Sequence, residues 1–134
     1  MVTIAHDGLI KLWDIDMMEL VSSARMRCGY LTSLLNFEKG YLVGTGNGEI
    51  VKFSGNLQKE WTRKIHSDCV NDMLETDLHL ISIGSDGKVI FMLKPTLSIE
   101  KELELGVPLT KMTLVGEEIY VAGNPSFKID LRTF

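Results

Sequence analysis

Four short turn dipeptides recur along the chain at nearly constant spacing, and this recurrence limits the fold more than any other feature. Asp7-Gly8, Asn47-Gly48 and Asp86-Gly87 are 40 and then 39 residues apart, and Asn124-Pro125 follows 38 residues later. Asn-Gly and Asp-Gly favour the tight turns that join two antiparallel strands. The spacing therefore predicts a repeated all-β fold with one such hairpin in each unit.

The segments around each turn repeat as well. A short apolar segment precedes each turn and an alternating one follows it, as in LISIGS and KVIFML around Asp86-Gly87. A more polar segment comes next, and a further apolar segment leads into the following turn. Four strands in about 40–45 residues are typical of a β-propeller blade. The stretch LSIEKELEL also fits a short amphipathic helix, but its place in the repeat predicts an outer strand.

Counted in this way, the strands fall into units of three, four, four and three, about 14 in all, whereas closed propellers have 4–8 blades of four strands. We therefore expect an all-β chain that forms an open partial propeller with four-stranded antiparallel blades, incomplete at both ends. The units of this single domain are 1–28, 29–67, 68–106 and 107–134. Because open strand edges are a liability, we expect the rest of a propeller or another copy of the chain to cover them.

Composition narrows the functional class. The net charge of −4 argues against a general nucleic-acid partner, since that affinity comes largely from Lys and Arg. We see no secretory leader and no apolar run of about 18 residues, so we expect no membrane partner and an intracellular, cytoplasmic protein. Cys28 and Cys69 lack metal-ligand spacing. We expect two free thiols in a reducing compartment, and no metal or other cofactor.

Two segments carry a resemblance to a known family. HDGLIKLWDID and SDCVNDMLETDLHLISIGSDGKVIFM stand at the same phase of the repeat and resemble the WD-repeat family. Blades of that family often contain a buried hydrogen-bonded tetrad. It consists of a His in the loop between blades, a turn Asp, a Ser or Thr four residues before this Asp, and a Trp six residues after it. The imidazole and hydroxyl supply the partners that a buried carboxylate needs.

The resemblance assigns tetrad members unit by unit. In the first unit they are Thr3, Asp7 and Trp13, and in the third they are His66, Ser82 and Asp86. The other two units retain little of the tetrad: the corresponding residues are Val43, Asn47 and Phe53 in the second unit, and Tyr120, Asn124 and Asp130 in the fourth.

His66, Ser82 and Asp86 are also the residue types of a hydrolytic triad. However, no G-x-S-x-G turn surrounds Ser82, which lies in a strand whose phase repeats elsewhere in the chain. We therefore interpret the three residues as structural and expect no enzyme activity.

The loops between consecutive units provide candidate partner contacts. In the WD-repeat family these loops open on one face of the propeller. Arg and Tyr are enriched at binding hot spots. The candidates are Arg25, Arg27 and Tyr30 in the first loop, and Lys64 and Asp68 in the second.

Three functional hypotheses follow from resemblance. The WD-type repeats imply a non-catalytic scaffold for protein–protein interaction. More narrowly, DGLIKLWDIDMMELV and YLVGTGNGEI are similar to repeats of the echinoderm microtubule-associated-protein-like family, which implies tubulin as partner. The stretch GYLVGTGNGEIVKFSGNLQKEW is also similar to a blade of quinoprotein-type propellers, which implies a redox enzyme or an assembly factor. The first hypothesis leads because no phosphate loop or metal cluster is visible in the sequence.

Overall fold

The computed structural model describes residues 1–5, 7–26 and 30–133. These residues form strands, and a short 3-10 helix, η1 (Leu131–Thr133), follows the last strand. The strands are β1 (Val2–Ile4), β2 (Leu9–Asp14), β3 (Glu19–Arg25), β4 (Leu31–Phe37), β5 (Gly40–Thr45), β6 (Glu49–Phe53), β7 (Lys59–Lys64), β8 (Val70–Glu75), β9 (His79–Gly84), β10 (Lys88–Leu93), β11 (Ser98–Glu104), β12 (Lys111–Val115), β13 (Glu118–Ala122) and β14 (Phe127–Asp130).

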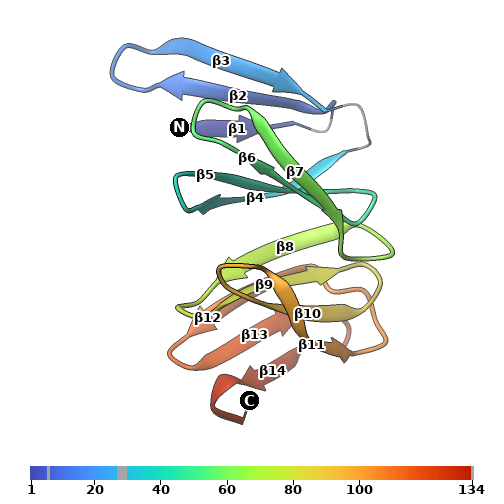
Figure 1. Ribbon diagram of the computed structural model, residues 1–134. Helices are drawn as coiled ribbons and strands as arrows, with labels where there is room; N and C mark the ends of the chain where they lie inside the picture. Colours follow the sequence, from blue (N-terminus) through green and yellow to red (C-terminus); the bar gives the residue numbers. More distant parts are fainter. Residues whose placement is uncertain (6, 27–29, 134) are drawn as a thin grey trace.

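The strands pair into four antiparallel sheets in which sequence neighbours are also neighbours in the sheet. The orders are β1-β2-β3, β4-β5-β6-β7, β8-β9-β10-β11 and β12-β13-β14. Figure 1 shows the four sheets stacked in chain order, with the N-terminus at the first and the C-terminus at the fourth. This arrangement confirms the predicted all-β, open partial propeller with three-stranded first and last sheets. It also confirms Ser98–Glu104 as a strand rather than a helix.

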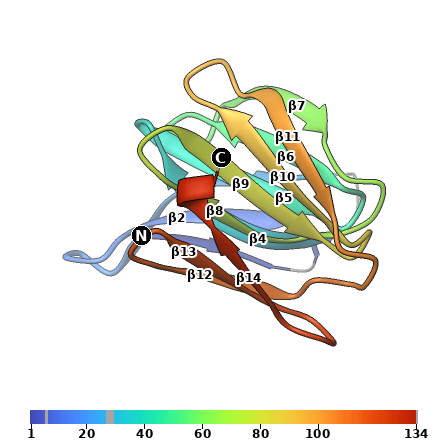
Figure 2. The ribbon, with the colours of Figure 1, turned by 90° about the horizontal axis from the view of Figure 1, so that it is seen from below.

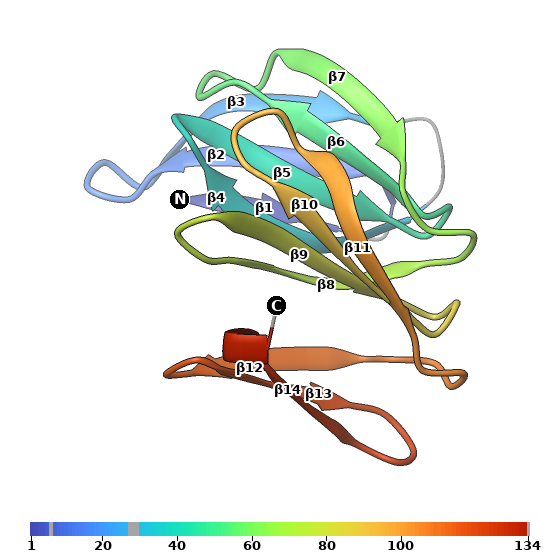
Figure 3. The same ribbon diagram turned by 60° about the horizontal axis from the view of Figure 1, so that its bottom comes forward.

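β4, β8 and β12 are the first strands of the second, third and fourth sheets, and they lie next to one another in the stack. β8 packs against both β4 and β12, so these three strands join consecutive sheets at their inner edges. Figure 2 views the stack from the side of the fourth sheet, and Figure 3 shows the succession from the first sheet to the fourth.

The repeat is also visible in the backbone. Gly8, Gly48 and Gly87, which follow Asp or Asn in the predicted turns, have φ angles of +88°, +86° and +80°. This left-handed conformation is open to glycine without steric cost. The turn between the last two strands of a unit has its own signature, because Met18, Leu57 and Leu97 have φ angles of +56°, +64° and +58°. The first three sheets therefore repeat both turns.

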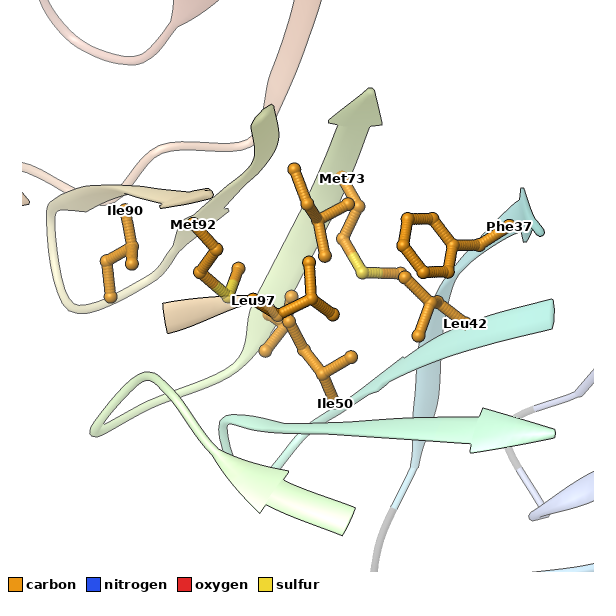
Figure 4. Packing of buried hydrophobic residues seen from close by; sticks show 9 residues of the cluster. Phe37, Leu42, Ile50, Met73, Ile90, Met92 and Leu97 are labelled. Atoms are coloured by element: carbon orange, nitrogen blue, oxygen red, sulfur yellow. The ribbon is translucent and has the colours of Figure 1, made fainter. Parts of the chain in front are cut away.

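The core consists of three apolar clusters, one between each pair of consecutive sheets. Figure 4 shows the middle cluster, where Phe37, Leu42 and Ile50 of the second sheet pack against Met73 and Met92 of the third. The central strands of the two middle sheets, β5, β6, β9 and β10, are buried on both faces, which explains why their sequences are mostly apolar, whereas the outer strands β7 and β11 are polar. Each sheet is thus stabilised mainly by its neighbours rather than by itself.

Candidate functional site

His66, Ser82 and Asp86 meet at the boundary between the second and third sheets. His66 lies in the loop before β8, Ser82 on β9, and Asp86 in the turn between β9 and β10. The His66 Nδ1 is 2.9 Å from Asp86 Oδ1, and the His66 Nε2 is 2.8 Å from Ser82 Oγ. Because the carboxylate only accepts, Nδ1 donates to Asp86, and the second ring nitrogen, Nε2, is hydrogen-bonded to the Ser82 hydroxyl.

The backbone completes this arrangement. The amides of Ser67 and Lys88 donate to the two carboxylate oxygens of Asp86. Burial by itself raises the pKa of Asp86, but the hydrogen bond and charge of His66 and these two amides outweigh it and lower the pKa below 3.8. Gly84 leaves room for the pair, since a Cβ there would lie 2.7 Å from His66 Nδ1.

The same three residues offer no open approach to a substrate. Ser82 is fully buried, and the side chains of His66 and Asp86 are 0% and 4% exposed. A nucleophilic hydroxyl must reach its substrate. The geometry therefore favours the structural interpretation. The hydrogen-bonded chain Ser82–His66–Asp86, which we call the relay, fixes the loop before β8 against the turn of the third sheet.

The first unit contains only part of such an arrangement. Trp13 Nε1 donates to Thr3 Oγ1 at 3.2 Å, so the structure brings these two predicted residues together. Asp7 is exposed, and its carboxylate accepts from the amide of Leu9, which corresponds to the bond from Lys88 to Asp86. Asp7 and Trp13 share no hydrogen bond among the described contacts. A solvated Asp7 needs no buried imidazole.

The corresponding positions of the second sheet have become apolar. Val43 and Phe53 are both buried in the cluster between the first and second sheets. Met92 of the third sheet, which stands at the predicted Trp position, is also buried.

The fourth sheet departs from the predicted alignment. Val121 and Ile129 pack against the third sheet, whereas Tyr120 is 44% exposed. The facing residues are thus one position away from Tyr120 and Asp130, which the sequence spacing predicted. In the third sheet the Gly87 amide closes the turn by donating to the carbonyl of Gly84. Pro125 follows Asn124 at the matching place and has no amide hydrogen for this bond.

The predicted loop contacts lie beside the tight turns of the sheets. Met26 donates to the Gly8 carbonyl and His66 to that of Gly48, so each loop is bound to the turn of its own sheet. The candidates Lys64 and Asp68 are exposed, Tyr30 is 60% exposed, and Arg25 donates to the backbone carbonyl of Asp7. Arg27 lies outside the described residues, as do His6 and Cys28.

A second feature was not predicted from the sequence: the face of the first sheet that points away from the second sheet. We call it the free face. It surrounds an open groove of about 470 Å³ lined in part by Trp13, Thr3 and Lys11. Lys11 Nζ lies 5.9 Å from the centre of the Trp13 ring, and Met1 and Met18 at the rim are 63% and 82% exposed. Half of the exposed large apolar side chains in the described part of the chain lie in β3, in the turn before it or at the residue before β1: Met1, Ile15, Met17, Met18, Leu20 and Val21.

Residues at matching positions in the next two sheets are buried by a neighbouring sheet. Trp13 corresponds to Phe53 and Met92, which are 2% and 1% exposed. Met18 corresponds to Leu57 and Leu97, which adopt the same turn conformation and are 5% and 3% exposed. The free face thus has the position of a sheet–sheet interface, and no sheet formed by the described residues covers it. Aligning the units would have identified Met18 from the sequence.

The opposite end of the stack differs. The outer face of the fourth sheet carries exposed Lys111, Thr113 and Lys128. Tyr120 donates to Glu118 at 3.0 Å, and Lys128 lies 3.6 Å from the same carboxylate. This hydrogen bond to Glu118 is the main cause that raises the pKa of Tyr120. The same face also exposes Val115 and Tyr120, so it mixes polar and apolar side chains.

Neither a metal centre nor a spanning helix is found in the residues that the structure describes. No group of three or more His, Cys, Asp or Glu side chains is placed to hold an ion. No helix in this part of the chain is long and apolar enough to cross a membrane.

Comparison with known proteins supports the fold alone. No family model and no curated protein matches the sequence. Among solved structures, the chain is similar to the computationally designed Ika8 protein, with a TM-score of 0.81 and 20% identity over 97% of this chain and 42% of that one. It is also similar to the computationally designed Ika4 protein, with a TM-score of 0.83 and 16% identity over 97% of this chain and 84% of that one. The chain thus spans less than half the length of Ika8.

Proposed function

We propose that this chain is a non-catalytic scaffold for protein–protein interaction, built from WD-type repeats, and that its free face binds a β-sheet of a partner protein. The observation that carries the proposal is the contrast between two positions of the first sheet and their counterparts in the second. Met18 is exposed and Trp13 is only half-buried, whereas Leu57 and Phe53 at the matching positions are buried in an interface. A face of this kind on a protein surface marks an interaction site.

The chemistry of the partner follows from the interfaces within the chain. At each one, an antiparallel sheet presents Val, Leu, Ile, Phe or Met side chains to the next sheet. The free face has the same strand geometry, so the matching partner is a sheet with apolar side chains on one side. In the first sheet Lys11 occupies the position that corresponds to Val51 and Ile90, which are buried in the next two sheets. An acidic side chain of the partner opposite Lys11 would therefore pair with its charge.

The loop residues Arg25, Arg27, Tyr30, Lys64 and Asp68 stay a prediction of a second contact surface. In the proposed scaffold these loops and the free face would contact different parts of an assembly.

The experiment is a pull-down that compares which proteins bind to three immobilised forms of the chain. The parent and the double variant Trp13→Asp, Met18→Asp test the free face, and Thr113→Asp, at an exposed polar position on the outer face of the fourth sheet, is the matched control. We expect a set of proteins that the parent and the control retain and the double variant loses. Identical sets for all three forms would refute the proposal.

A further inference from the structure

Lys52 breaks the apolar pattern of the repeat. In the register of the second sheet Lys52 lies opposite Leu42 on β5 and opposite Trp61 on β7. The residues at the matching positions of the first and third sheets are Leu12 and Phe91. Those two pack into apolar interfaces, and Lys52 is itself only 5% exposed. A buried ammonium is costly unless its charge and its hydrogen bonds are compensated.

The compensation in the structure is partial. Lys52 Nζ donates to the carbonyl of Phe53 and to the carboxylate of Glu60, both at 3.2 Å. An ammonium has three donors, and the described contacts use two of them. The Glu60 side chain is 46% exposed, so its carboxylate is free to move into solvent.

The ammonium lines a pocket of about 270 Å³ between the second and third sheets. The apolar walls are Phe37, Trp61, Pro95 and Leu97. Arg63 also lines the pocket and donates from Nη1 to the carbonyl of Leu97 at 2.8 Å. No carboxylate in the described part of the chain lies within ion-pair distance of Arg63, so its charge has no acidic partner there.

The acidic residues of the pocket limit the charge of a ligand. Glu38 and Glu60 also line the pocket. Both are exposed, whereas Lys52 is buried. Water screens charges at the rim more than those inside, so the interior favours an anion. A dianion would meet the two rim carboxylates as well, which favours a single negative charge.

We propose that this pocket binds a monocarboxylate carried on an aromatic or aliphatic group, with its carboxylate at Lys52 and Arg63 and its apolar part against Trp61. Charge-assisted hydrogen bonds to two cations hold the carboxylate. The ligand is either a free small acid or the C-terminus of a peptide, which present the same chemistry. The site goes beyond the scaffold role and does not depend on it.

The test uses Trp61 as the reporter. In a Trp13→Phe background Trp61 is the only tryptophan of the chain, and Phe53 shows that this position accepts phenylalanine. We titrate phenylacetate and follow Trp61 fluorescence. A ligand of this size binds with a Kd on the order of 1 mM. Phenylacetamide and inorganic phosphate should produce no saturable change at the same concentrations.

Two variants assign the effect to the pocket. Lys52→Met should raise the Kd at least tenfold and still fold, because the other sheets have Leu12 and Phe91 there. Arg63→Gln should also raise it at least tenfold. Lys59→Met removes an exposed charge from the same strand outside the pocket and should leave the Kd within twofold.

Three results would overturn the proposal: no saturable change with phenylacetate, equal affinity for phenylacetamide or phosphate, or an unchanged Kd in both Lys52→Met and Arg63→Gln. A peptide ending in phenylalanine, with a free or an amidated C-terminus, distinguishes the two sources. Tighter binding of the free peptide than of phenylacetate supports a peptide C-terminus, and weaker binding supports a small acid.

Discussion

The imidazole of His66 lies 2.9 Å from the carboxylate of Asp86, and both side chains are almost wholly removed from water. His66→Ala leaves Asp86 and Ser82 buried without this partner. We expect the free energy of unfolding to fall by about 1–3 kcal/mol, the cost of unsatisfied buried groups. Chemical denaturation followed by circular dichroism measures this loss.

The matched control is His79→Ala. His79 pairs with Glu100 at 2.9 Å, but the Glu100 side chain is 52% exposed. Solvated pairs contribute little, so this loss should stay under about 1 kcal/mol. Equal losses for the two variants would mean that the relay does not hold the loop before β8.

Stability should depend on the ionisation of Asp86. The pKa of Asp86 in the folded chain lies below the ordinary value of 3.8. The stabilisation is therefore complete above about pH 3.8, the unfolded value, and is lost as the pH falls through the lower folded value. The parent should be more stable than Asp86→Asn at pH 6, and the difference should shrink below pH 4. A difference that stays constant to pH 3 would refute this assignment.

The turn glycines should differ in their tolerance of alanine. Gly48 has a φ of +86°, and a Cβ there would lie 2.0 Å from the carbonyl oxygen of His66. Gly106 has a φ of +77° with nothing within 4 Å of the added atom. Gly106→Ala should cost only the left-handed conformation, about 1–2 kcal/mol, and Gly48→Ala clearly more. Urea denaturation of both variants measures the two losses in the free energy of unfolding. Equal losses would contradict the described turn at Gly48.

The repeated turn leucines provide a comparison at one backbone conformation. Leu57→Ala and Leu97→Ala should each lower the free energy of unfolding by about 2–5 kcal/mol, because both side chains are buried between sheets. Met18→Ala should change it by less than about 0.5 kcal/mol, since this side chain is 82% exposed. If Met18→Ala were as destabilising as the other two, the free face would be covered in the isolated chain.

Much of the fold follows from the sequence because each unit repeats the same local chemistry. Asp86-Gly87 and its counterparts fix a tight turn, and the phase of the flanking apolar residues fixes the strands. The contact of His66 with Ser82 and Asp86 was also predicted from the sequence, but through the resemblance to the WD-repeat family rather than from spacing alone.

The rest depends on packing between sheets, which spacing does not encode. Asn124-Pro125 keeps the period, yet Tyr120 lies on the outer face of the fourth sheet, one position away from Val121, which packs against the third sheet. Lys52 reads as an ordinary alternating residue in EIVKFS. Only the stacked sheets show that it is buried.

The free face of the first sheet is tested most directly by a photo-crosslinking residue placed at Met18. The same residue at Thr113, an exposed polar position on the outer face of the fourth sheet, is the comparator. We predict that Met18 crosslinks to a β-strand of another protein, identified by mass spectrometry, and that Thr113 does not. Crosslinks no more frequent at Met18 than at Thr113 would contradict the proposed scaffold.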